Sequence, residues 1–206
     1  MHDFLLLVGG FALTTVAGGL LGYWLQGRMW RHQERNRLQQ AQIHAARAFY
    51  EELSRLLDRR LHRMRQLDGQ LDRPRQADEV DRLLNRYRDV LDEWNDNLNR
   101  NLALGISYFG QLVHAALEAL YEDFSLAGSQ IETRVREYRE NGQASSSAVT
   151  LRLRGLDLVI YDLNLAMIEA LQRESVGVPN KDRNKTSPAP TLGSAAERLS
   201  RRLTER

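Results

Sequence analysis

The N-terminal part of the chain holds a run of 23 residues, 4–26, without a single charged side chain. The hydrocarbon layer of a membrane is about 30 Å thick, and about 20 residues of helix cross it. The run therefore predicts a transmembrane anchor over residues 1–27. Two alternatives agree less well with the sequence. A cleaved signal peptide has its basic residues before the apolar core, and a buried helix of a soluble domain needs no uncharged segment of this length.

The residues that flank this run predict its orientation. Aromatic and basic side chains follow it where interfacial anchors belong, namely Tyr23, Trp24, Arg28, Trp30 and Arg31. The preceding flank holds only His2 and Asp3 beside the initial methionine. Because basic residues collect on the cytoplasmic side, we expect a single-pass protein of the bacterial inner (plasma) membrane. Its N-terminus would lie outside, its C-terminal domain in the cytoplasm, and membrane lipid would be a partner.

Small residues recur every fourth position within the same run: Gly10, Thr14, Gly18 and Gly22. Such spacing places them on one face of a helix, and Gly18-x-x-x-Gly22 is the motif that lets two membrane helices approach closely. The alternative is that glycine is simply common in membrane helices. The stripe predicts a homo-oligomer, or pairing with another membrane protein.

The sequence that follows the anchor predicts an all-α domain over residues 28–173. Apolar residues are spaced by three and four in three stretches, from Ile43 to Leu71, from Val80 to Tyr138 and from Leu151 to Leu171. The pattern breaks at Asp72-Arg73-Pro74 and at Asn141-Gly142, while Gly105, Gly110 and Gly128 are candidate bends within the long second stretch. We expect a long helical hairpin or a three-helix, coiled-coil-like bundle.

Residues 174–206 predict a disordered, flexible tail with one short basic helix. The stretch 175–193 holds three prolines and no apolar periodicity, which is typical of a linker. Ser194 then begins a capping box, and arginines alternate with two leucines up to the C-terminus. Two interpretations remain open for this helix: a solvated end that frays, or a segment that touches the anionic inner leaflet.

Charge is unevenly distributed along the predicted helices. Residues 28–75 carry a net charge of +6, and residues 76–140 carry −6. An antiparallel hairpin that turns near Arg73 would set Leu53 near Glu93, with the arginines of the first helix along the carboxylates of the second. Such pairs contribute more to the choice of the partner helix and its direction than to the stability of the hairpin. The same pairing between the helices of two copies agrees equally well with the charge distribution. In either case the arginines have carboxylate partners, which makes nucleic-acid binding a weaker interpretation.

The sequence holds no recognisable catalytic, metal or cofactor motif. It has no cysteine, no Glu-x-x-His pair of the kind that binds di-iron centres, no nucleophile elbow and no phosphate-binding loop. The pairs Asp58/His62 and His114/Glu118 each share a helix face, but nothing brings them together. We expect a protein that is not an enzyme and that has no cofactor and no nucleic-acid partner.

The most unusual segment is 94–101, where asparagines alternate inside a predicted helix. Asparagine is a poor helix former, and one buried asparagine can fix the register of a bundle. Three interpretations remain open: a capped bend, a register-setting polar layer, or a site for a ligand or partner. The candidate residues are Trp94, Asn97, Arg100 and Asn101.

These observations lead to two functional hypotheses. The first is a non-enzymatic, membrane-tethered helical interaction or scaffold module, either a homo-oligomer or an accessory subunit of a membrane assembly. The second is a cytoplasm-facing sensor or regulatory module with a ligand site near Trp94–Asn101.

Overall fold

The computed structural model describes the backbone of residues 2–72, 77–145, 149–173, 176 and 195–204, and their side chains except those of 2–32, 35, 77, 195 and 196. Within these ranges the chain forms five helices and no strand, which confirms the predicted all-α class. It divides into two units, residues 1–42 and residues 43–206. All contacts described below lie within the second unit.

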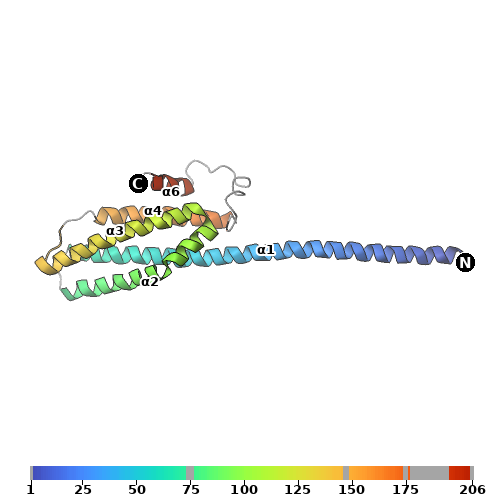
Figure 1. The fold of residues 1–206 in the computed structure, drawn as a ribbon, viewed down its shortest axis with the longest axis horizontal. Helices are drawn as coiled ribbons and strands as arrows, with labels where there is room; N and C mark the ends of the chain where they lie inside the picture. The colour runs from blue at the N-terminus through green and yellow to red at the C-terminus, as the bar shows by residue number, and fades with distance from the viewer. Residues whose placement is uncertain (1, 73–76, 146–148, 174–175, 177–194, 205–206) are drawn as a thin grey trace. The chain divides into compact units, whose positions relative to one another are not determined.

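The helices end where the sequence contains residues that break a helix. Their bounds are α1 His2–Leu71, α2 Ala77–Phe109, α3 Gln111–Asn141, α4 Val149–Gln172 and α6 Ala195–Thr204 (Figure 1). Gly110 separates α2 from α3 with a φ of 86°, a conformation that glycine adopts without strain. Gly142 caps α3 in the left-handed region, and its N–H donates to the carbonyl of Tyr138.

Residues 43–71 of α1 form an up-and-down bundle with α2, α3 and α4 (Figure 1). Contacts between side chains fix the antiparallel order: Glu52–Arg100 and Arg59–Glu93 join α1 to α2, Asp81–Arg139 and Trp94–Phe124 join α2 to α3, and Asp123–Arg152 joins α3 to α4. The bundle therefore has four long helices rather than the predicted three, because the break at Gly110 divides the second apolar stretch.

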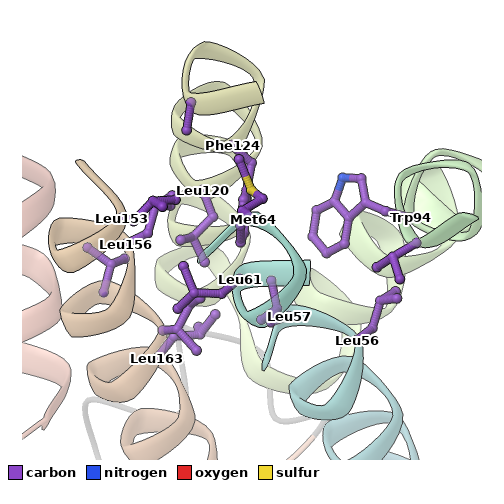
Figure 2. Close-up of a cluster of buried hydrophobic side chains, with 14 of the residues drawn as sticks. Leu56, Leu57, Leu61, Met64, Trp94, Leu120, Phe124, Leu153, Leu156 and Leu163 are labelled. Atoms are coloured by element: carbon purple, nitrogen blue, oxygen red, sulfur yellow. The ribbon is translucent and has the colours of Figure 1, made fainter. Parts of the chain in front are cut away.

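The core lies between these four helices. Figure 2 shows its side chains pointing toward one another, with Leu57 and Met64 from α1, Phe124 from α3 and Leu163 from α4 among them. Each of these side chains is fully or almost fully buried. They belong to the apolar stripes seen in the sequence, so the three- and four-residue spacing identified most of the inward positions. Ile106 and Leu151 are exceptions, because they lie on these stripes but are exposed.

The predicted membrane localisation is not supported. A membrane span needs about 20 nearly uninterrupted apolar residues. Among the residues that the structure describes, no helix is both long enough and apolar enough to cross a membrane. Even α4 carries five charged side chains in 24 residues. This finding contradicts a single-pass inner-membrane protein with an outer N-terminus and a cytoplasmic C-terminal domain, and it leaves the transmembrane helix predicted over residues 1–27 without support.

Candidate functional site

The predicted polar segment of α2 is divided between the core and the surface. Trp94 and Asn101 are buried, whereas Asn97 and Arg100 lie at the surface. The Asn97 side-chain amide donates to the carbonyl of Glu93 at 2.9 Å, one turn earlier in the same helix. The Arg100 guanidinium donates to both carboxylate oxygens of Glu52, at 2.9 and 3.1 Å. The four candidates therefore do not face one common layer or pocket.

The side chains predicted to pack or anchor a membrane helix lie outside those that the structure describes. They are Gly10, Thr14, Gly18, Gly22, Tyr23, Trp24, Arg28, Trp30 and Arg31.

Arg60, one of the first-helix arginines expected to lie along the carboxylates of the second helix, lies in the core beside Trp94. Arg60 is only 2% exposed, and its guanidinium carbon lies 5.2 Å from the centroid of the Trp94 ring and 4.5 Å from that of Phe124. The guanidinium also bonds to the buried hydroxyl of Tyr87. Its Nε and Nη1 atoms have no hydrogen-bond partner among the described residues. A cation is thus held in the core mainly by aromatic rings.

Burial dominates the electrostatics of this cluster. It lowers the pKa of the Arg60 guanidinium and raises the pKa of the Tyr87 phenol, because each charged form loses its hydration. The spacing of the sequence contains a signal for this position. Arg60 lies three residues after Leu57 and four before Met64, on the apolar stripe itself.

A second polar cluster closes one end of the bundle. Arg134 of α3 is buried and pairs with Asp68, which is also buried, and with the exposed Asp72. Its Nε atom donates to the carbonyl of Ser145 at 3.0 Å, and Asp68 accepts a further bond from Thr150 at 3.0 Å. The cluster joins α1, α3 and the start of α4, and its partners satisfy one another. Its role is therefore structural.

The short basic helix of the tail, α6, is docked on the bundle. It packs against α4 and α3, and its Leu199 is completely buried. The carboxylate of Asp162 in α4, only 2% exposed, receives one arginine on each oxygen: Arg198 Nε at 3.2 Å and Arg202 Nε at 2.6 Å. The short basic helix predicted for the tail is thus present over residues 195–204, and a buried acid on α4 offers it a specific partner.

The outer face of α4 is apolar and uncovered within the described part of the chain. Leu151 is 73% exposed, Leu158 49% and Tyr161 61%. Their spacing of seven and three residues places them on one side of the helix, beside the half-buried Leu165. This stripe was not predicted, because the apolar spacing of residues 151–171 was interpreted as one inward face. The signal was present, since leucines recur almost all round this helix.

The stripe and the tail helix occupy neighbouring parts of one surface. Gly155, within the exposed stripe, and Asp162, under α6, are seven residues apart and so lie two turns from each other on the same side of α4. A Cβ atom placed on Gly155 would meet no heavy atom within 4 Å. This surface of α4, open at its N-terminal half and covered by α6 at its C-terminal half, is the candidate functional site.

Within the described ranges, no group of three or more His, Cys, Asp or Glu side chains is placed to hold a metal ion. Comparison with known proteins adds no assignment: no protein-family model, no curated protein and no solved structure matches this chain.

Proposed function

We propose that this protein is a non-enzymatic helical interaction module that pairs reversibly with a second copy of itself through the outer face of α4. The observation that carries the proposal is the exposed apolar stripe formed by Leu151, Leu158 and Tyr161. Large apolar side chains that are exposed singly need no explanation, but a contiguous row at helical spacing is typical of a docking surface.

The charges beside the stripe favour a second copy as the partner. Arg154 and Asp157 lie beside the stripe and are both exposed, although Asp157 also pairs with Arg65 of α1 at 3.0 Å. In an antiparallel pair centred on residue 156, Leu151 of each copy would face Tyr161 of the other. Arg154 of each copy would then lie near Asp157 of the other. One surface is thereby complementary to itself, as a two-fold interface requires.

The size of the stripe argues for a weak pair. Burying six leucine and tyrosine side chains, three from each copy, contributes about 9 kcal/mol at ~1.5 kcal/mol each. Association costs at least about 4 kcal/mol. The remaining ~5 kcal/mol corresponds to a sub-millimolar dissociation constant. The proposal is therefore a reversible dimer whose population rises with concentration, not an obligate one.

Sedimentation velocity over a range of concentrations from micromolar to millimolar tests this proposal. The wild-type chain is expected to shift toward a dimer, and the Leu151→Glu/Leu158→Glu variant to remain a monomer, because two carboxylates would have to be buried in the interface. Leu126→Glu changes an equally exposed leucine on α3, outside the stripe, and should leave the dimer intact. A wild-type chain that stays monomeric throughout, or a double variant that still dimerises, would disprove the pairing.

A cross-link tests the geometry of the pair. The chain has no cysteine, so any disulfide formed by a variant with one introduced cysteine must join that position in two copies. Gly155→Cys lies beside the proposed two-fold axis and should form a disulfide-linked dimer under mild oxidation. Leu126→Cys, on α3, should not. Equal cross-linking of both variants would point to random collision instead.

A further inference from the structure

The tail helix α6 docks on the bundle from the far end of a long connection. It is separated from α4 by residues 173–194 and packs against α4 and α3. One leucine, Leu199, is completely buried, while Arg198 and Arg202 keep more than a third of their side-chain surface exposed. The attachment includes Leu199, the partly buried Leu203 and two charge-assisted bonds to Asp162.

The receiving surface is part of α4 and centres on Asp162. Asp162 projects from α4 on the side opposite its core residues Leu156 and Ile160, so α6 is what buries its carboxylate. A buried carboxylate is costly unless it is paired and hydrogen-bonded. The site therefore discriminates in favour of a helix that presents two arginines four residues apart with a leucine beside the first, as Arg198, Leu199 and Arg202 do.

The tail is also able to reach another molecule. A ten-residue helix is too short to be stable alone in water, so α6 gains its structure on docking. Its own groove holds it through a high effective concentration rather than through a large interface. Val176 is buried in the core, and a chain of the 18 residues between it and Ala195 would span up to about 60 Å when extended, far more than one helix width.

From these observations we propose that the groove around Asp162 is a docking site for a basic amphipathic helix, and that the tail helix of a second copy occupies it in exchange for the chain's own α6. The exchange adds a second, tail-dependent contact between copies. It does not require the pairing of α4 faces, because the tail alone supplies the contact.

A charge-reversal complementation experiment tests the exchange. One full-length chain carries Asp162→Arg with a normal tail, and a second carries Arg198→Asp/Arg202→Asp with a normal groove. In each chain the groove and its own tail repel, but the tail of either chain matches the groove of the other. Both chains also carry Leu151→Glu/Leu158→Glu, which removes the α4 pairing and keeps the two proposals separate.

The expected result is a heterodimer in the equimolar mixture and monomers in each chain alone, measured by sedimentation velocity. A chain with all three reversals restores the match in cis, so its α6 should dock on its own groove as in the wild type. Mixtures that remain monomeric, while circular dichroism shows both chains folded, would overturn the proposal.

Peptide binding keeps the proposal testable if a reversed chain fails to fold. A fluorescent peptide of residues 194–206 is titrated into full-length Leu199→Ala, whose own tail is weakened. We expect saturable binding that falls by more than about tenfold when Asp162→Asn is added, because the two arginines lose their charged partner. Binding that is unchanged by Asp162→Asn, or no binding to either chain, would overturn the groove as a docking site.

Discussion

The guanidinium of Arg60 lies 4.5 Å from the centre of the Phe124 ring, inside a core that otherwise consists almost entirely of apolar side chains. The Trp94 ring lies on the same cation at 5.2 Å. The guanidinium donates a hydrogen bond to the Tyr87 hydroxyl. Because two of its nitrogen atoms have no partner in the described part of the chain, the cluster is a costly element of the fold.

Removal of the Tyr87 hydroxyl should expose this cost. In Tyr87→Phe the buried guanidinium loses its acceptor, and the free energy of unfolding should fall by roughly 1–3 kcal/mol. In Tyr87→Phe/Arg60→Met, where an apolar side chain of similar length replaces the cation, stability should return to the wild-type level or exceed it. Urea denaturation measures both values. A double variant less stable than Tyr87→Phe would show that the aromatic rings stabilise Arg60 more than its burial costs.

The close contact between α3 and α2 at Gly128 gives a second prediction. A Cβ atom at this position would lie 2.6 Å from the Tyr87 hydroxyl, whose ring is buried and bonded to Arg60. Gly128→Ala should therefore destabilise the bundle by about 1–3 kcal/mol through overpacking. The cost should shrink when Tyr87→Phe removes the clashing atom, which a double-mutant cycle measures.

Gly69 supplies the matched control for this substitution. It also lies within a helix, but a Cβ atom there would meet nothing within 4 Å. Gly69→Ala should raise stability by about 0.5–1 kcal/mol, because alanine loses less backbone entropy in a helix than glycine does. A similar loss in both variants would place the effect in the helical backbone rather than in the contact with Tyr87.

The buried pair Arg134–Asp68 should matter far more than an exposed pair of the same chemistry. Arg134→Met leaves Asp68 buried with only Thr150 as a partner, and should cost about 3–5 kcal/mol. Arg139→Ala breaks the exposed pair with Asp81 and should cost less than about 1 kcal/mol. Thermal unfolding followed by circular dichroism distinguishes the two. Equal effects would contradict the structural role of the Arg134 cluster.

Much of the fold was predictable because apolar spacing and helix-breaking residues are local signals. The inward positions of Leu53, Leu57 and Met64 follow from the stripe, and α3 ends at the Asn141-Gly142 stop. The hairpin register was less accurate. The pairs Arg59–Glu93 and Glu52–Arg100 both have residue 76 as their midpoint, three residues beyond the predicted turn at Arg73, because charge balance alone does not fix where a connection turns.

The features that were missed depend on tertiary contacts. Arg60 is a charged residue at a core position. Its burial is explained by its contacts with the rings of Trp94 and Phe124, which the sequence does not show. The tail helix was predicted from its capping box, but its binding site is a single acid, Asp162, which in the sequence resembles any solvated carboxylate. Leucines all round α4 are visible in the sequence, but the spacing does not say which of them face the core and which form the open face.

Acidification should weaken the link between Glu137 of α3 and Ser145, in the segment that follows this helix. Its carboxylate accepts bonds from the hydroxyl and the backbone N–H of Ser145, at 2.6 and 3.1 Å, and these bonds lower the pKa of Glu137 below its ordinary value of 4.5. A carboxyl group with a lowered pKa in the folded state stabilises that state fully above the unfolded-state pKa. The contribution disappears as the pH falls through the lower, folded-state value.

The thermal midpoint, followed from neutral pH to below 4.5, should therefore fall less steeply in Glu137→Gln than in the wild type, since the amide does not titrate. Ser145→Ala removes one donor but keeps the backbone N–H, so its pH profile should lie between the two. Glu52 offers a second case, because the hydrogen bond from Arg100 lowers its pKa in the same direction. Parallel profiles for the wild type and Glu137→Gln would show that the bonds to Ser145 do not persist in solution.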